Sequence, residues 1–377
     1  MTGQSLAILS EVSSASSAAD LLAPPWMCDL WFVILCLLLV GYAILDGFDL
    51  GVGIIHLIIG RNARERAVHT NVIGPIWDGN EVWLVTLGGA LFAAFPLAYG
   101  SIFSAFMVPL VMVLFCLIAR AASLEFRSKA SGPRMILLCD VAFSLASLLA
   151  TFLLGVAVGA VMEGIPIDEA GNLVLPGIMT SGGAGPFEEI TFAMTSFSVT
   201  CGILAVTVFA LHGAMFLNLK ATGITEKRIG QAFPALYYAF ATTLLMTTYL
   251  AFRDVDSVSF STPSVILVTI LNVIAILNLP RAMYRGRKWS GFIASSFMVA
   301  ALVFLFGSAV HPNLLVSSLD PTWSITVQNA ASTRATLLTM LVVVSVGIPF
   351  ILLYTAITYW TFRGTVSIEG EEGESDS

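Results

Sequence analysis

The sequence predicts an all-α polytopic membrane protein with about nine transmembrane helices. Of its 377 residues, 57% are apolar and only 11% are charged, whereas soluble domains carry about 25% charged residues. Long apolar stretches fill most of the chain, so the lipid bilayer is the relevant solvent. These stretches are continuous rather than alternating, which favours helices over the strands of a membrane barrel.

The predicted spans follow from length, because a helix needs about 20 apolar residues to cross the hydrocarbon core. Nine segments meet that length, approximately residues 30–59, 75–97, 102–122, 135–162, 190–219, 231–252, 262–284, 289–310 and 333–362. We therefore predict an extramembrane N-terminal extension over residues 1–29 and a single transmembrane domain over residues 30–363. Residues 364–377 form an acidic tail, and nothing in the composition suggests nucleic-acid binding.

The basic residues predict the orientation of the spans. Of the 17 Lys and Arg residues, 15 lie in alternate connections or after the last span, and only Arg253 and Arg334 lie on the other side. Cytoplasmic loops are enriched in Lys and Arg. We therefore expect the N-terminus and the acidic 163–189 loop to lie outside and the C-terminus to lie in the cytoplasm.

Four acidic residues lie inside predicted spans, where a carboxylate is costly unless it is paired, hydrated or neutralised. Asp46 and Asp49 lie in the first span, and Asp78 and Glu81 lie early in the second. The spacing i, i+3 puts each pair on one helical face. Because a short loop joins the two spans, we expect the four acids to cluster in the cytoplasmic half of the membrane. Such a cluster is typical of a proton or cation path.

A structural interpretation of the acids stays open. They could cap helix ends or accept hydrogen bonds from Asn80, and this alternative is strongest for Asp78. Asp140, one turn into the fourth span, is interpreted as an ordinary interfacial polar group. Three glycines of the first span are expected to let another helix approach closely: Gly47, Gly51 and Gly53.

Histidine placement argues against haem ligation by this chain. A haem-binding helix bundle needs axial His or Met ligands from facing helices. The four histidines show no opposed pair deep in the bilayer: His56, His69, His212 and His311. The five cysteines form no CxxC pair and are interpreted as small buried apolar residues. We predict no metal site and no catalytic residue in this chain.

Several long motifs resemble subunit II of cytochrome bd quinol oxidases. The strongest similarity lies in three segments of the first 130 or so residues: 46–53, 75–84 and 88–96. Segments 120–129 and 349–360 look like the same family. The resemblance covers residues 30–363 and leaves out the N-terminal extension and the acidic tail.

The resemblance implies a fold and a set of partners. The fold would be two four-helix bundles plus one helix in the bacterial cytoplasmic (inner) membrane. The haems, b and d or a b-type variant, and the quinol site would belong to a larger partner, subunit I, and this chain would ligate none of them. Some members hold a bound structural quinone. A small single-helix subunit and lipids are further expected partners.

The resemblance also assigns roles to residues of this sequence. Asp46, Asp49 and Asp78 match the family's acids of a cytoplasmic proton-uptake path. Glu81 is assigned to the same path, although it departs from the family pattern, in which other members have Gln at this position. The motif neighbours are Trp77, Asn80 and Trp83. Three further residues are placed at the cytoplasmic interface: Arg120, Glu125 and Arg127.

The expected function is that of subunit II in a membrane quinol:O2 oxidoreductase. Quinol oxidation would be coupled to reduction of oxygen to water and to generation of a proton gradient. This chain would support the haem-bearing subunit and contribute to proton uptake and oxygen access. The alternative is a secondary transporter with a carboxylate site at the membrane midplane, which would suit the intramembrane acids. A third interpretation is a haem-free assembly subunit with no chemistry of its own.

Overall fold

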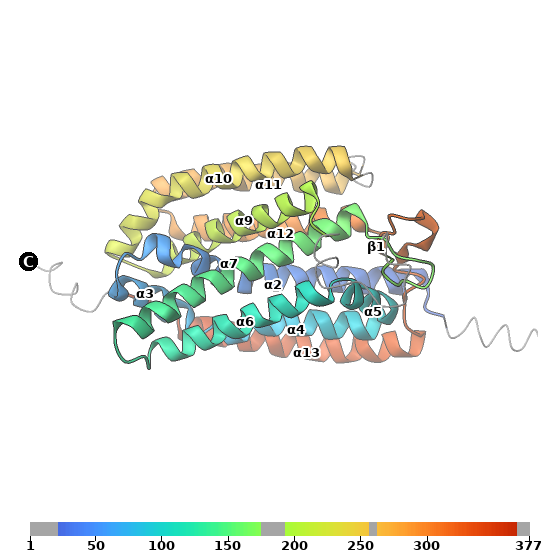
Figure 1. The fold of residues 1–377 in the computed structure, drawn as a ribbon, viewed down its shortest axis with the longest axis horizontal. Coiled ribbons are helices and arrows are strands. Elements are labelled where there is room, and N and C mark those ends of the chain that lie inside the picture. The colour runs from blue at the N-terminus through green and yellow to red at the C-terminus, as the bar shows by residue number, and fades with distance from the viewer. Residues whose placement is uncertain (1–21, 175–192, 256–261, 368–377) are drawn as a thin grey trace, which may run out of the picture.

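The computed structural model describes residues 22–174, 193–255 and 262–367. Within these ranges the chain forms eleven α-helices (Figure 1): α2 (Pro25–Ile59), α3 (Ala63–Ile73), α4 (Trp77–Ala94), α5 (Pro96–Ala105), α6 (Met107–Arg127), α7 (Pro133–Glu163), α9 (Ser196–Lys220), α10 (Ile224–Asp254), α11 (Pro263–Tyr284), α12 (Lys288–Val310) and α13 (Arg334–Thr361). Two short antiparallel strands, β1 (Asn313–Leu315) and β2 (Ile325–Thr326), flank the 3-10 turn η1 (Pro321–Trp323). The predicted all-α fold is confirmed.

Eight of the described helices are long and apolar enough to cross a membrane. The ninth predicted span, residues 75–97, corresponds to α4, which has 18 residues. Its first turns contain Asp78, Asn80 and Glu81, so it is less apolar than a typical span. The chain is therefore a multi-pass membrane protein. One of its helices, α4, carries polar side chains that lie among the apolar helices.

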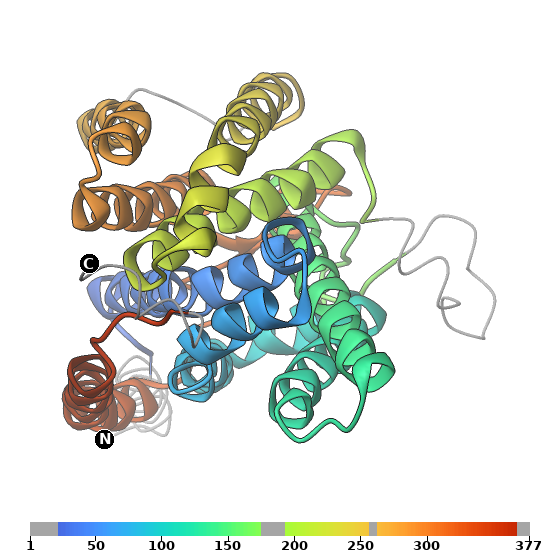
Figure 2. The same cartoon turned by 90° about the vertical axis from the view of Figure 1, so that its left-hand side faces the viewer.

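The long helices fall into two groups and one separate helix (Figure 2). The first group contains α2, α4, α6 and α7, and the second contains α9 to α12. Helices α2 and α7 pack against α9 and so join the two groups, while α13 lies against α4. This arrangement agrees with two four-helix bundles plus one helix.

Glycine lets α2 and α9 approach closely. A Cβ atom added at Gly51 would lie 1.8 Å from the carbonyl oxygen of Phe209, and one added at Gly213 would lie 2.4 Å from the backbone of Gly51. On the neighbouring face, a Cβ atom at Gly53 would lie 2.0 Å from the Ser147 hydroxyl of α7. A Cβ atom at Gly47 would lie 2.9 Å from the Phe209 ring. The predicted helix-packing role of Gly47, Gly51 and Gly53 is confirmed, and it fixes α2 at the junction of the two groups.

Helix boundaries differ from the predicted spans where proline or charge intervenes. Helix α2 begins at Pro25 rather than near residue 30, because proline is well suited to the first helical turn. Helix α4 ends at Ala94, with Phe95 as its C-cap, since Pro96 cannot continue the ladder of backbone hydrogen bonds and instead begins α5. The loop between the first two spans contains α3. This helix is charged and short, so it does not have the apolar length by which the spans are predicted.

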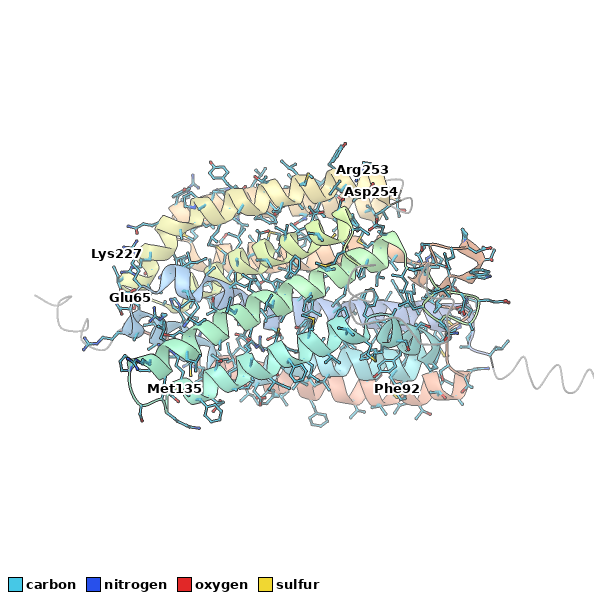
Figure 3. The ribbon with its side chains drawn as sticks, in the orientation of Figure 1. Glu65, Phe92, Met135, Lys227, Arg253 and Asp254 are labelled. Atoms are coloured by element: carbon cyan, nitrogen blue, oxygen red, sulfur yellow. The ribbon has the colours of Figure 1, made fainter. Side chains whose placement is uncertain are left out.

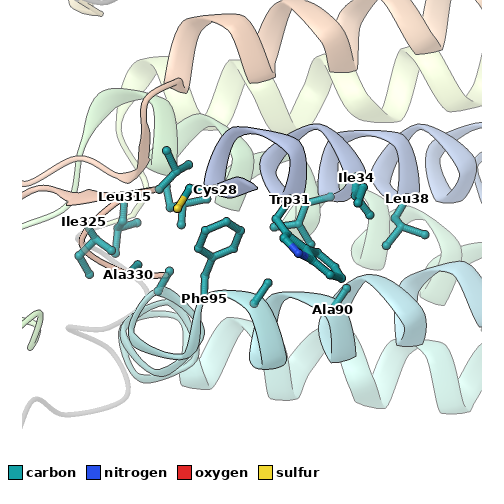
Figure 4. Close-up of a cluster of buried hydrophobic side chains, with 14 of the residues drawn as sticks. Cys28, Trp31, Ile34, Leu38, Ala90, Phe95, Leu315, Ile325 and Ala330 are labelled. Atoms are coloured by element: carbon teal, nitrogen blue, oxygen red, sulfur yellow. The ribbon is translucent and has the colours of Figure 1, made fainter. Parts of the chain in front are cut away.

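Apolar packing fills the end of the first group that is remote from α3. Trp31 and Leu38 of α2 lie over Ala90 and Phe95, and Leu315 closes the cluster (Figure 4). Trp31, Phe95 and Leu315 are fully buried. Figure 3 shows the two ends of the molecule, with Glu65 and Lys227 at one end and Arg253 at the other. The polar site described next lies towards the end marked by Glu65.

Candidate functional site

An ion-pair triad links three helices of the first group. Arg120 of α6 donates through Nη1 to Oδ1 of Asp46 in α2 at 2.7 Å, and through Nη2 to Glu81 in α4. Asp46 is fully buried, Arg120 is 1% exposed and the Glu81 side chain is 27% exposed. The triad therefore runs from a partly accessible carboxyl to a fully enclosed one.

The structure corrects the expectation for Arg120. Its place near the end of an apolar segment suggested the cytoplasmic interface, but the side chain lies among α2, α4 and α6 as the counterion of two carboxylates. Oδ2 of Asp46 and Nε of Arg120 are both buried without a hydrogen-bond partner among the described residues. Buried polar atoms normally have a partner, which can be an ordered water.

A second polar chain joins α2 and α4 to the separate helix α13. Asn80 donates through Nδ2 to Oδ2 of Asp49 at 2.7 Å, and its Oδ1 accepts from the hydroxyl of Tyr359 at 3.1 Å. Asp49 is 1% exposed and Asn80 is 2% exposed. Oδ1 of Asp49 is buried without a partner among the described residues. Tyr359 is a site residue that the sequence pattern does not reveal, since a tyrosine near the end of a span usually marks the membrane interface.

Asp78 begins this polar region at its exposed edge. It lies in the first turn of α4, is exposed, and pairs with none of the described cations. Glu81 is three residues further along the same helical face. Trp77 and Trp83 are both buried, and the Trp83 ring fills the space beside Gly41 of α2. The two tryptophans therefore seal the α2–α4 contact around the acids.

Asp140 belongs to a separate buried cluster near α3. It accepts from His56 Nε2 at 3.0 Å, from Arg66 Nε at 2.6 Å and from Arg127 Nε at 2.5 Å. Its side chain is fully buried, so its interpretation as an ordinary interfacial group is wrong. Arg127 is 9% exposed, whereas Glu125 remains on the surface, 58% exposed and 3.9 Å from Lys129.

Of the buried histidines, His56 and His212 use both ring nitrogens within the protein, whereas Nε2 of His69 has no hydrogen-bond partner among the described residues. His212 Nε2 lies 3.0 Å from the carbonyl of Ile44 and its Nδ1 lies 2.9 Å from the Ser295 hydroxyl. His56 contacts Asp140 through Nε2 and His69 through Nδ1, at 3.3 Å. Neither His56 nor His212 therefore presents a free nitrogen to a haem iron. Among the described residues no group of three or more His, Cys, Asp or Glu side chains could hold a metal ion.

Comparison with known proteins identifies the family. The model of the family described as "Cytochrome bd terminal oxidase subunit II" matches residues 27–362. The chain belongs to this family. It is 30% identical over 380 residues to the cytochrome bd-I ubiquinol oxidase subunit 2 of Escherichia coli K12, covering 92% of this chain and 97% of that protein. It is also 30% identical over 344 residues to the cytochrome bd ubiquinol oxidase subunit 2 of Bacillus subtilis, covering 90% and 96%.

The fold comparison agrees with the family assignment. The bd oxidase structure from Geobacillus thermodenitrificans contains a chain with a TM-score of 0.68 to this one at 18% identity. The match covers 89% of this chain and 99% of that chain. As a member of the subunit II family, the chain is expected to work beside a subunit I. The family assignment favours the oxidase interpretation over the secondary transporter.

Proposed function

We propose that this chain is the second subunit of an electrogenic quinol:O2 oxidoreductase and that its α2–α4–α6 site takes up protons from the cytoplasm. The haems and the site of oxygen reduction lie in a partner subunit I, and this chain ligates none of them. The proposal is supported by the relatives of this chain, which are ubiquinol oxidase subunits. The intramembrane acids give the chain a role beyond support of the partner.

One observation carries the proton-uptake proposal: the acids form a series of decreasing exposure. Asp78 is exposed, Glu81 is 27% exposed, and Asp46 and Asp49 are enclosed. A proton entering at the α3 end meets a carboxyl at each stage of this series. Tyr359 and Asn80 extend the hydrogen-bonded chain beyond Asp49 towards α13.

The charges of the enclosed site are unbalanced, which suits a group that exchanges protons. Of its three carboxyls, those of Asp46 and Glu81 pair with the Arg120 guanidinium, while that of Asp49 accepts from the neutral amide of Asn80 and has no cationic partner among the described residues. An uncompensated buried charge costs several kcal/mol, so the site can accept a proton to approach neutrality. The partnerless oxygens of Asp46 and Asp49 are positions where water can deliver that proton.

The position of the acids determines the side of the membrane from which the oxidase takes up protons. Reduction of oxygen to water consumes protons, while oxidation of quinol releases them. If the consumed protons come from the cytoplasm and the released protons leave on the outer side, charge is separated across the membrane without a pump. The described residues of this chain would then bind, hold and pass protons at the carboxyl oxygens of the α2–α4 acids.

The test replaces each carboxyl by an amide of the same shape in the assembled oxidase. Asp49→Asn and Asp78→Asn are expected to slow steady-state oxygen uptake about tenfold with quinol in excess, which corresponds to about 1.4 kcal/mol of barrier. The haem absorbance and electron entry in a single turnover should remain parental. Asp168→Asn is the matched control, because Asp168 lies in the loop after α7, remote from the α2–α4–α6 site, and accepts from its near neighbours Ala170 and Asn172.

Two results would overturn the proposal. Parental turnover in the Asp46, Asp49 and Asp78 variants would show that these acids do not carry the consumed protons. Loss of haem together with loss of assembly would support the structural interpretation, in which the acids only hold the helices together.

A further inference from the structure

The surface of the second helix group contains a groove between α11 and α12. Its volume is about 780 Å³. Three polar residues line one end, Asn278, Arg281 and Ser290, and apolar side chains of both helices line the rest. The lining is polar at the end near the α11–α12 turn and apolar elsewhere. The groove therefore has a short cationic end and a long apolar part, which is complementary to an amphipathic ligand with an anionic headgroup.

The groove has the length of one leaflet of a bilayer. On α11 it extends from Leu271 to Arg281, which at 1.5 Å per residue is about 15 Å. The hydrocarbon core of a bilayer is about 30 Å thick, so the groove spans about half of it. Tyr284 and Trp289 flank the polar end and are 70% and 67% exposed. Exposed Trp and Tyr residues mark the headgroup level of a membrane protein.

The polar end of the groove is arranged to receive an anion. Arg281 is exposed and has no acidic partner among the described residues. The acid Glu226, also at this end of the molecule, is paired with Lys288 at 2.9 Å. Below the guanidinium, Asn278 donates through Nδ2 to the Ser290 hydroxyl at 3.1 Å and so links α11 to α12. Ser290 Oγ donates to no acceptor among the described residues, so its proton is available to an acceptor such as a phosphate oxygen.

We infer that this groove binds an anionic phospholipid, with the phosphate at Arg281 and Ser290 and an acyl chain along the apolar wall. Charge decides between the amphipathic ligands of a membrane. A quinone has an apolar tail but a neutral headgroup, so it would leave the Arg281 charge unpaired, whereas an anionic headgroup adds a charge-assisted hydrogen bond. The site does not depend on the proton-uptake proposal, because it lies on the second helix group and shares none of its residues with that site.

The test uses the whole purified oxidase in nanodiscs and counts bound lipid by native mass spectrometry. Phosphatidylglycerol is the anionic probe and phosphatidylcholine is the zwitterionic one. Arg281→Gln is expected to reduce the retained phosphatidylglycerol about fivefold, in line with a contribution of about 1 kcal/mol for one basic residue at a lipid headgroup. Arg281→Lys keeps the charge and should retain the lipid.

The matched control is Arg285→Gln, which removes an exposed arginine one turn further along that does not line the groove. We expect this variant to retain as much phosphatidylglycerol as the parental oxidase. The inference is overturned if Arg281→Gln and Arg285→Gln lose the same amount of lipid, or if phosphatidylcholine is retained as well as phosphatidylglycerol. It is also overturned if the Arg281 change alters the quinone content instead, or if the partner subunit covers the groove in the assembled oxidase.

Discussion

Arg120 of α6 and Asp46 of α2 form a 2.7 Å ion pair although neither side chain is more than 1% exposed. The two residues are 74 positions apart in the chain, so this pair fixes α6 against α2. Two enclosed charges are tolerated because each compensates the other, and removal of one partner leaves an uncompensated charge that typically costs about 3–5 kcal/mol. The pair is therefore both a helix connection and the centre of the proposed proton site.

The first prediction concerns the coupling between these two charges. Arg120→Gln should lower the thermal stability of the oxidase sharply, because it leaves the carboxyls of Asp46 and Glu81 without a cation. Adding Asp46→Asn should recover part of the loss, so the double variant is more stable than the sum of the single effects predicts, by about 1–3 kcal/mol. Differential scanning calorimetry of the purified complex measures the stability of the parental, single-variant and double-variant forms.

An exposed ion pair provides the comparison for that cycle. Glu125 and Lys129 are 58% and 70% exposed at 3.9 Å, and such pairs contribute about 0–1 kcal/mol. Glu125→Gln and Lys129→Gln should therefore be nearly additive. If the Arg120 and Asp46 changes are equally additive, the two buried groups do not act as a pair.

The second prediction tests the hydrogen bond between α13 and Asn80. Tyr359→Phe keeps the ring and removes only the hydroxyl that donates to Asn80 at 3.1 Å. If this hydroxyl orients Asn80 on Asp49, oxygen uptake should slow several-fold while the haem spectrum is unchanged. Tyr354→Phe is the matched change on the same helix, since Tyr354 is 53% exposed and covers Gly79 with its ring. Equal effects of the two changes would argue against a role for the Tyr359 hydroxyl.

Local sequence pattern was sufficient for the long helices and for the location of the acids on them. Apolar length identified the long helices, and the spacing of Asp46 with Asp49 and of Asp78 with Glu81 placed them on facing surfaces of α2 and α4. The structure brings Asp46 and Glu81 to one arginine, but it leaves Asp78 at the exposed edge. The short helix α3 was missed because the search for spans used apolarity, and α3 is charged.

The partners of the acids could not be predicted, because they depend on contacts between distant segments. Arg120 lies near the end of an apolar run and so resembles a loop cation, and only the packing of α6 on α2 shows that it is buried. Tyr359 has the pattern of an interfacial aromatic residue, and its inward hydrogen bond depends on α13 lying against α4. A single sequence contains no periodic signal for such pairings.

The third prediction is a dependence of stability on pH that comes from His69 of α3. Burial, together with the neighbouring His56 and Arg127, lowers the pKa of His69 to about 3, whereas an unperturbed histidine has a pKa of about 6.5. When α3 opens, His69 gains a proton at any pH between these two values. Opening therefore becomes easier as pH falls through 6.5, and its free energy should decrease by about 2 kcal/mol between pH 6.5 and 5.

Hydrogen exchange of the α3 amides against pH measures this effect. His69→Gln cannot titrate and should remove the pH-dependent part, leaving a flatter profile between pH 5 and 7. Asn71→Gln changes an exposed, non-titrating residue of the same helix and should keep the parental slope. A parental slope in the His69 variant would assign the dependence to another group.

The last prediction concerns Asp140, which holds α3 to the ends of α2, α6 and α7. Its carboxylate accepts from His56, Arg66 and Arg127, and an amide offers one acceptor oxygen and turns an NH2 group towards the remaining donors. Asp140→Asn should therefore release Arg66, which is 14% exposed and can reach water, and loosen α3. We expect a loss of about 3 kcal/mol in stability, at the lower end of the range for a broken buried pair, and faster hydrogen exchange over residues 63–73.

Glu226→Gln is the control, because it also removes one carboxylate at this end of the molecule. In its pair with Lys288, Glu226 is 40% exposed and Lys288 is 27% exposed, so this change should alter stability by less than about 1 kcal/mol. Because α3 leads directly into α4, the loosened helix should also slow oxygen uptake through displacement of Asp78, with the haem content unchanged. If the exchange of α3 stays parental in Asp140→Asn, the cluster does not hold this helix, and the position of Asp78 must be set by α4 and α13 alone.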